Sequence, residues 1–538
     1  MNSLFRINKR YSVFLLFLLL FSGTTYSQAV FTMNVNEKSG TNHQFWKAAG
    51  HDDMFLLTKK NSDAGNYILS RIKEHQSIVY ARVHCTFSDE HRGGKVIVRH
   101  ADGTYDYDFS IVNSTFQQYV AHGMKPIVEF DFFPDGFAKP LGGGENSEGF
   151  DSRNAEPKDW NEWEKLMRAF MENLIAEFGK DEMRTWYYEV WNEPDGWPTE
   201  HIHVFYRLYD TFAHVVKSYD EGFRVGGPAM YSVHALKPFL DHVTSGTNFV
   251  TGQKGSPIDF ISHHIYGLSG SWLNSSPEIF PQVSRFSQEL LWLQRLIEKY
   301  NELENTEFHL NEWGLSSHYF KPVKEFPRLV YRNNEISPLF MVKLVDCLYA
   351  IEDEFNFKTS LMLYWGFSME DEMNVMFAGH RELTTGGHTP KPILTGYEFL
   401  SKLQADRLKV DGNLPGSRLG IIPTVGNEKM AFIVYNFNET DDDLSVQDLV
   451  NVNIDGLTAD AKLNCKVYVL DREQNNTYAM WLKAGAPATP DKLPSSWFES
   501  ANRHEYTDKI ISSDESGKVS FELSLPRHSM QLFIIDMK

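Results

Sequence analysis

The sequence predicts an α/β protein, a (β/α)8 TIM barrel followed by a C-terminal antiparallel β-sandwich domain. Three observations support this prediction. Up to about residue 405, short apolar strands alternate with amphipathic helices. Beyond that point, strand-like runs are separated by turn residues. The 538 residues also exceed what one hydrophobic core usually serves, so we expect a barrel domain at 28–405 and a smaller sandwich domain at 406–538.

The amino end carries the marks of a cleaved secretory signal over residues 1–27. Arg6, Lys9 and Arg10 precede the apolar run VFLLFLLLF (13–21), and small polar residues follow it. The run is short for a membrane span. We therefore expect an exported protein, periplasmic or extracellular, with no membrane partner once the signal is removed.

Seven segments of the barrel domain are predicted as strands, and an eighth is expected before Met54. They are rich in apolar, branched and aromatic residues. The segments are 77–87, 125–133, 185–191, 223–230, 259–266, 307–314 and 360–368. Helical patterns lie between them, as in 163–180, where apolar residues recur every three or four positions and Gly179 supplies a stop. An open doubly wound sheet is the alternative, but no glycine-rich phosphate loop follows the first strand.

Three runs after residue 405 are predicted as strands of the sandwich. They cover 418–439, 462–472 and 518–536, and Gly, Asn, Asp and Pro turns separate them. One further strand-like segment, 29–35, lies far from these runs in the chain. It is able to join the sandwich or the barrel.

Composition narrows the classes of partner. The net charge of −19 argues against a nucleic-acid partner. An aromatic content of 14% is compatible with a carbohydrate cleft, although core packing explains most of it. Cys85, Cys347 and Cys465 are widely spaced and imply no disulfide framework. Because no HExxH or EF-hand spacing occurs, we predict neither a metal site nor a cofactor.

Two Asn-Glu dipeptides follow apolar strands and suggest acid–base chemistry. Glu193 lies in WYYEVWNEPDGW (186–197), where Pro194 and Gly196 end the strand, and Glu312 follows EFHLN (307–311). In a count of eight strands these dipeptides end the fourth and the seventh, where the working groups of a barrel collect. Either glutamate alone fits a structural charge. The pair favours glycosidic chemistry, in which the separation of the carboxyl groups decides between retention and inversion.

Several stretches, by their order and spacing, carry a family resemblance. They are ARVHCTFSDE (81–90), residues 105–138, EVWNEPDGW (189–197), DFISHHIYG (259–267), HLNEWGLSSHY (309–319), LYWGFSMEDE (363–372), GGHTPKPILTGYEFL (386–400) and, in the terminal domain, DREQNNTYAMWLKAGAPATP (471–490). Together they resemble glycoside hydrolase family 39, the β-xylosidases and α-L-iduronidases. The last stretch resembles a sandwich segment of the xylosidases. The likeness covers nearly all of the mature chain.

The resemblance assigns roles to individual residues. It makes Glu193 the general acid/base and Glu312 the nucleophile of a retaining mechanism, with Asn192 hydrogen-bonded to the sugar 2-hydroxyl. Glu193 must then be protonated while Glu312 is ionised. Strand alternation puts His264 and Tyr266 on one face, and a tyrosine hydroxyl near the nucleophile would hold it ionised. Residues that match family positions around the sugar ring are His84, Phe132, His264, Tyr266, Trp365 and Glu372.

The identity of the sugar rests on conflicting signs. Family members that cleave iduronides carry a Lys where this chain has Tyr266, which favours xylose. Arg332 falls where the iduronidases place an Arg that meets the substrate carboxylate, and Ser368–Met369 departs from the Ser-Asp of the xylosidases. We expect a secreted retaining β-xylosidase that releases xylose from xylosides or polysaccharide-derived oligosaccharides. The alternatives are a uronosidase or a hydrolase of another modified polysaccharide, and a non-catalytic carbohydrate-binding protein, against which the intact glutamates count.

Overall fold

The computed structural model describes most of the chain after the expected secretory signal. The described residues are 29–51, 62–89, 96–142, 152–268, 280–317, 322–367, 372, 374–386, 388–440 and 446–537. The expected signal at 1–27 and the pair Ser368–Met369 lie outside them.

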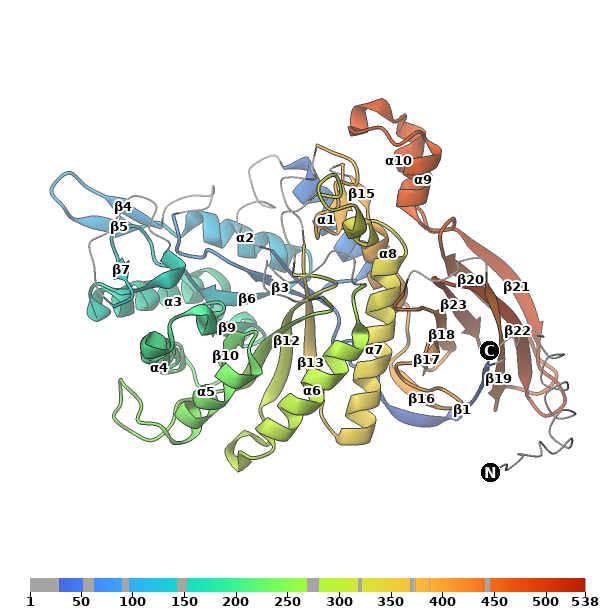
Figure 1. Cartoon of the computed structure of the whole chain (residues 1–538), viewed down its shortest axis with the longest axis horizontal. Coiled ribbons are helices and arrows are strands. Elements are labelled where there is room, and N and C mark those ends of the chain that lie inside the picture. The colour runs from blue at the N-terminus through green and yellow to red at the C-terminus, as the bar shows by residue number, and fades with distance from the viewer. Residues whose placement is uncertain are drawn as a thin grey trace, which may run out of the picture.

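Eight parallel strands close into a barrel in the larger domain (Figure 1). Neighbours follow in chain order, and the last strand pairs with the first. The strands are β2 (Ala48–His51), β3 (Tyr80–Val83), β6 (Lys125–Phe130), β9 (Tyr187–Val190), β10 (Arg224–Met230), β11 (Phe260–Tyr266), β12 (Glu307–Gly314) and β13 (Thr359–Trp365). The seven predicted barrel strands and the eighth before Met54 are confirmed.

A helix follows each barrel strand along the chain. The helices are α1 (Asp63–His75), α2 (Ser110–Ala121), α3 (Trp160–Met183), α4 (Ile202–Tyr219), α5 (Val233–Ser245), α6 (Val283–Ile297), α7 (Ile336–Phe355) and α8 (Pro392–Leu400). The Asp159 carboxylate caps α3 by accepting a hydrogen bond from the Asn161 main chain at 2.8 Å. Gly179, the predicted stop, interrupts α3 with a φ of 74°, and helical structure resumes as far as Met183.

Short antiparallel hairpins lengthen three of the loops that follow barrel strands. The hairpins pair β4 (Ile97–Arg99) with β5 (Tyr105–Tyr107), β7 (Ala138–Pro140) with β8 (Ala155–Pro157), and β14 (Thr384–Thr385) with β15 (Thr389–Pro390). The sequence did not predict them. They lie after β3, β6 and β13, so they extend the rim of the barrel mouth.

The smaller domain is one sheet of nine strands that folds over on itself. Its order is β21-β20-β23-β18-β17-β16-β1-β19-β22. Phe521 at one end of the sheet contacts Phe432 and Phe533 in its middle, at ring distances of 6.4 and 5.4 Å. The strands are β1 (Ala29–Thr41), β16 (Asp406–Asp411), β17 (Leu419–Val425), β18 (Lys429–Asn436), β19 (Gln447–Asp455), β20 (Lys462–Leu470), β21 (Tyr506–Ser512), β22 (Val519–Pro526) and β23 (Ser529–Asp536).

Two features of this domain were left open or missed by the sequence. The segment 29–35 belongs to β1, which pairs antiparallel with β16 and parallel with β19 and so joins the sandwich sheet. The stretch 471–490, expected as a sandwich segment, contains the short helix α9 (Thr477–Lys483) between bends and turns, and a second helix, α10 (Ser495–Ala501), follows it before β21. Trp481 of α9 packs on Phe377, in the loop after β13, at 5.1 Å.

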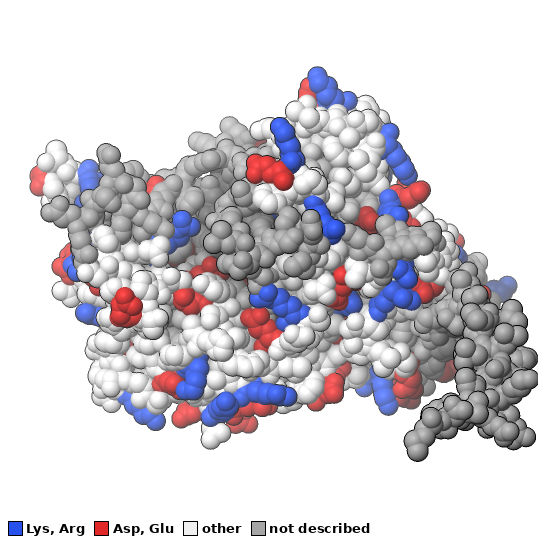
Figure 2. Space-filling model, in the orientation of Figure 1, with Lys and Arg blue, Asp and Glu red and all other residues white. Residues whose placement is uncertain are grey.

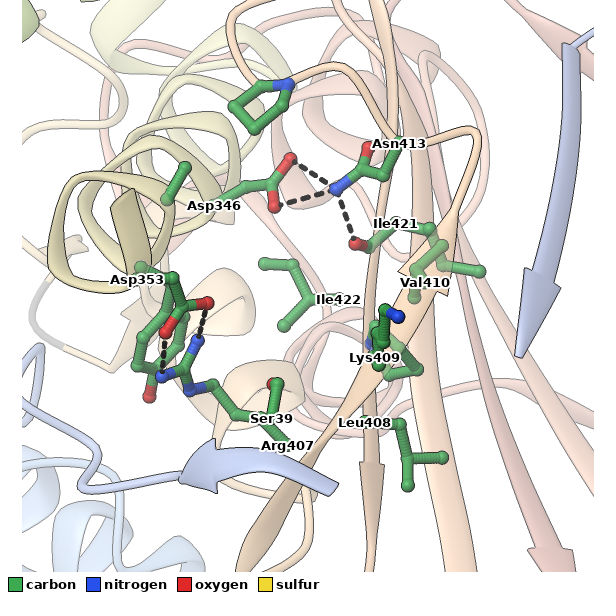
Figure 3. Close-up of a pocket in the computed structure, with 14 residues that line it drawn as sticks. Ser39, Asp346, Asp353, Arg407, Leu408, Lys409, Val410, Asn413, Ile421 and Ile422 are labelled. Atoms are coloured by element: carbon green, nitrogen blue, oxygen red, sulfur yellow. Dashed lines mark hydrogen bonds and ion pairs between the residues drawn. The ribbon is translucent and has the colours of Figure 1, made fainter. Parts of the chain in front are cut away.

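Helix α7 packs against the sandwich and lines a cavity of about 260 Å³ there (Figure 3). The buried Asp346 carboxylate accepts hydrogen bonds from Asn413 at 3.1 Å and from the Tyr435 hydroxyl at 2.8 Å. Asp353, about two turns further along the same face of α7, accepts two hydrogen bonds of 2.7 Å from Arg407. These polar contacts fix the two domains to each other.

The surface carries charges of both signs, and the three cysteines are buried. On the face in Figure 2, Lys and Arg side chains are interspersed with Asp and Glu side chains. Cys85, Cys347 and Cys465 are buried free thiols, in agreement with the prediction from their spacing that they form no disulfide framework. Within the part of the chain that the structure describes, no helix combines the length and the apolar character needed to cross a bilayer.

Candidate active site

The two glutamates singled out by the sequence reach the barrel mouth from different local structures. Glu312 lies on β12, paired in register with His264 of β11. Glu193 follows β9 and precedes a 3-10 turn, η2 (Pro194–Gly196). Its φ of 48° is left-handed, as is that of Trp191 at 68°, an uncommon conformation for residues with a Cβ. A 2.9 Å hydrogen bond from the Glu193 main-chain nitrogen to the Ala229 carbonyl holds this turn against β10.

His264 lies between the two carboxyl groups. Its Nδ1 is 2.9 Å from Glu193 Oε1 and 3.6 Å from Glu312 Oε2. One carboxylate oxygen of Glu193 and one of Glu312 lie within 4.8 Å of each other. The Glu193 side chain is 36% exposed and that of Glu312 8%. Burial lowers the pKa of His264 well below its usual range, so the ring adds no charge to the pair.

Glu312 receives hydrogen bonds from both sides. The Tyr266 hydroxyl donates to its Oε1, and Arg82 Nη1 lies 3.4 Å from its Oε2. Burial raises the pKa of Tyr266 well above its usual range, so this hydroxyl stays a donor. Arg381, from the loop after β13, donates to the Tyr266 oxygen at 2.6 Å. Donors of this kind stabilise the ionised form of a carboxyl group.

A buried network centred on Arg82 lies beneath the glutamates. Arg82, on β3, contacts Glu189 of β9 at 2.9 Å and Glu129 of β6 at 2.6 Å. It also donates to Asn192 Oδ1 at 3.1 Å, while Asn311 donates to both Glu189 oxygens at 2.9 Å. Each Asn-Glu dipeptide therefore fixes its Asn to this network and presents its Glu to His264.

His84, Phe132 and Trp365 form one side of the mouth. The His84 ring lies 4.4 Å from Trp365 and 5.9 Å from Phe132, and its Nδ1 is 2.9 Å from Glu129. Burial opposes a charge on the ring, but Glu129 and Asp131 outweigh it and raise the pKa of His84 to about 10. The structure thus brings these three predicted residues together beside the Arg82 network.

Arg332 and Glu372, also predicted to meet the sugar, brace the loops of the mouth. Arg332 is buried and donates to the main-chain carbonyls of Ser316, after β12, at 3.2 Å and Gly379, after β13, at 3.3 Å. Glu372 is fully buried, pairs with Lys391 and accepts from the Gly379 main chain at 2.5 Å. Arg332 is therefore a buried side chain that joins the loop after β12 to the loop after β13.

Three groups of His, Asp and Glu among the described residues bring potential metal ligands within 4.8 Å of one another. They are His75 with Glu398 and His504, His84 with Glu129 and Asp131, and Glu193 with His264 and Glu312. In each group an arginine already contacts a carboxylate: Arg71 contacts Glu398, and Arg82 contacts both Glu129 and Glu312. A guanidinium in that position supplies the positive charge that a cation would bring.

Sequence reasoning missed the residues that organise the site. Arg82, Glu129 and Glu189 each interrupt an otherwise apolar strand, and this pattern was visible in the sequence. A charge inside a barrel strand needs a partner across the barrel, since buried charges are paired. Arg381 is in a loop, where nothing in the sequence distinguishes it.

The closed barrel and the paired glutamates at the ends of its fourth and seventh strands define the class of protein: it is a glycosidase. The chain belongs to Glycosyl hydrolases family 39, whose sequence pattern matches residues 30–496. The resemblance drawn from the sequence is confirmed.

Similar proteins agree with this assignment. A β-xylosidase of Caldicellulosiruptor saccharolyticus is 25% identical over 513 residues, which cover 93% of this chain and 96% of that protein. An α-L-iduronidase of Mus musculus is 21% identical over 61% of this chain and 55% of its own. The crystal structure of a monomeric β-xylosidase from Caulobacter crescentus has the same fold, with a TM-score of 0.74 and 21% identity over 94% of this chain and 99% of that one.

Proposed function

We propose that the protein is an exported retaining β-xylosidase that acts by double displacement. The observation that carries the proposal is that one carboxylate oxygen of Glu193 and one of Glu312 lie within 4.8 Å of each other. Retaining glycosidases hold their carboxyl groups about 5–5.5 Å apart, whereas inverting enzymes leave about 6.5–9.5 Å for a water molecule. The predicted signal at 1–27 supports export.

In the first step, the Glu312 carboxylate attacks the anomeric carbon. The glycosidic carbon–oxygen bond breaks, and Glu193 gives its proton to the departing oxygen. Tyr266 and Arg82 donate to the two oxygens of Glu312 and hold its carboxylate in place for the attack. Asn192 accepts from Arg82 through Oδ1, which directs its amide NH2 toward the sugar 2-hydroxyl.

In the second step, Glu193 acts as a base. It takes a proton from water as the water oxygen attacks the anomeric carbon, and the ester bond to Glu312 breaks. The sugar leaves with its original anomeric configuration, and both glutamates return to their starting states. The esterified Glu312 carries no charge during this step, which favours ionisation of Glu193.

A xyloside is the substrate that the similar proteins support best. The β-xylosidase relative matches over nearly the full length of both chains. Tyr266 also stands where the iduronidases carry a Lys, and its hydroxyl is already engaged with Glu312.

Substrate range, stereochemistry, covalent labelling and one substitution test the proposal. A panel of aryl xyloside, arabinoside, glucuronide and iduronide should give the highest kcat/KM for the β-xyloside, with retention observed by NMR. A 2-fluoro xyloside should label Glu312, and Glu312→Gly should reduce turnover at least about 10⁴-fold on every substrate. Labelling of a different residue, or inversion of configuration, would sink the mechanism.

A uronoside is the second candidate, and Arg381 favours it. This buried guanidinium donates to the Tyr266 hydroxyl beside the nucleophile. An arginine suits a substrate carboxylate because its planar fork offers paired donors. The interaction first considered for Arg332 is better supported at Arg381, since Arg332 donates to two main-chain carbonyls.

A further inference from the structure

One aromatic side chain at the barrel mouth presents an open ring next to Glu193. Tyr231 directly follows β10 and is 48% exposed, whereas Trp191 and Trp197 on the adjoining loop are 0% and 6% exposed. Other described aromatics with comparably open rings lie on α6, at the end of α7, in the segment after α5 and on the sandwich: Trp292, Phe355, Phe249 and Tyr506. Tyr231 is thus set apart by its position at the carboxyl end of a barrel strand.

Hydrogen bonds hold Tyr231 against the turn that carries Glu193. Asp195 Oδ2 accepts from the main-chain nitrogens of Tyr231 at 3.0 Å and Ser232 at 2.7 Å. On the other side of the same turn, the Glu193 nitrogen donates to Ala229 at 2.9 Å. The Tyr231 hydroxyl lies over Gly196, where an added Cβ would be 3.9 Å from it. The ring and the Glu193 carboxyl are therefore carried by one cross-linked unit.

The charges near the Tyr231 phenol agree with this geometry. Partial burial raises its pKa, and the carboxylates of Asp195 and Glu193 raise it further. The phenol therefore stays neutral, with an apolar ring and a polar tip, which is the character suited to a sugar.

The direction of proton transfer locates the leaving group. Because the acid gives its proton to the departing oxygen, the leaving group has to occupy the side of the cleft on which that acid lies. Glu193 and Tyr231 share that side. Resting on the function proposed above, we propose that Tyr231 forms the leaving-group subsite and stacks on the first sugar ring of the departing part of an oligosaccharide.

Substrates that differ only in the leaving group test this inference. In Tyr231→Ala, kcat/KM for β-xylobiose should fall about tenfold, whereas β-xylosyl fluoride, whose leaving group has no ring to stack, should change by less than about twofold. Tyr231→Phe should keep both values near wild type, because stacking needs the ring and not the hydroxyl. Tyr506→Ala, which removes a ring that is 47% exposed on the sandwich, is the matched control and should change neither.

The outcomes separate this inference from the proposed function. If wild type cleaves neither xyloside, the proposed function fails. If wild type cleaves both and Tyr231→Ala lowers both equally or neither, the subsite is overturned while the function stands. Acceptor transfer gives a second readout: xylose should accelerate release of the 2-fluoroxylosyl group from wild type more than from Tyr231→Ala, with equal rates in water alone.

Discussion

The barrel mouth and the interface between α7 and the sandwich both bury carboxyl groups, but they satisfy them differently. At the mouth, Glu129, Glu189 and Glu312 all contact the buried guanidinium of Arg82. At the interface, Asp346 accepts hydrogen bonds from Tyr435 and Asn413, which are uncharged. Burial there raises the pKa of Asp346 to about 6 despite those bonds.

The difference indicates what a working carboxylate requires. A nucleophile has to be ionised in a site that excludes water, and burial alone would protonate it. A buried cation acts against that tendency, although burial still raises the pKa of Glu129, which contacts Arg82, to about 8. A carboxyl group that only joins two domains has no such need, and neutral donors are sufficient to orient it.

After Glu312→Gly, Glu193→Ala should produce the largest effect, and it sharpens the comparison between the two carboxyl groups of the mouth. Glu193 is 36% exposed and Glu312 8%, in keeping with a group that exchanges protons with water and one that does not. Turnover of xylosides with poor leaving groups should fall by up to about 10⁴-fold, and that of activated aryl xylosides far less. Azide should restore the activated reaction by replacing the base. Exposed Glu200 offers a control, since Glu200→Ala should change neither; insensitivity of Glu193→Ala to both leaving group and azide would make Glu193 structural.

The next largest effect is expected in folding stability, where Arg82→Met should lose more than Arg407→Met. Arg82 and its partners Glu129 and Glu189 have no exposed side-chain surface. Removing the guanidinium leaves buried charges without a partner, which should cost about 3–5 kcal/mol in the free energy of unfolding. Arg407 pairs with Asp353, which is 44% exposed and can be hydrated, so its loss should cost about 1 kcal/mol. Urea unfolding measures both values. Equal losses would break the comparison between mouth and interface.

Asp346→Asn should reveal a pH-dependent effect at the interface. The carboxyl pKa is about 6 in the folded chain against 3.8 for a free aspartate, so its contribution to stability is full below about pH 4 and is lost as the pH rises through 6. The amide does not ionise and escapes this loss. Relative to wild type, the variant should therefore gain up to about 3 kcal/mol between about pH 4 and pH 7. Urea unfolding at both pH values measures the gain, with Asp353→Asn as control; a difference that stays constant with pH would show that Asp346 does not titrate in this range.

The fold and the pair of glutamates were within reach of the sequence for physical reasons. Strand periodicity and turn residues are local signals, and they located all eight barrel strands. Glu193 and Glu312 stand out because each follows an apolar strand directly. The strand-like segment 29–35 lies in β1, which pairs with β16 and β19, and its partner residues there are more than 370 residues away in the chain. Local pattern does not encode that choice of partner.

The supporting shell of the site could not be read in the same way. Arg381 reaches Tyr266 across 115 positions of sequence, and its loop gives no periodic signal. Arg332 fitted a family position, yet it donates to main-chain carbonyls of two loops. Matching Arg332 to a family position therefore located an arginine near the barrel mouth, but it did not establish which groups the guanidinium contacts.

The smallest expected effect concerns these two arginines and the identity of the sugar. If the substrate is a xyloside, Arg381→Met should lower xyloside kcat/KM by about tenfold, because Tyr266 loses the partner at 2.6 Å that orients it toward Glu312, and it should leave the preference for xyloside over uronoside unchanged. Arg332→Met is the matched control, a second buried guanidinium that braces loops, and it should alter stability more than preference. A wild type that prefers uronosides by tenfold, about 1.4 kcal/mol in transition-state binding, and loses that preference in Arg381→Met but not in Arg332→Met would replace the xyloside with the uronoside. The cation beside Tyr266 would then bind the substrate carboxylate, in addition to orienting the hydroxyl that donates to the nucleophile.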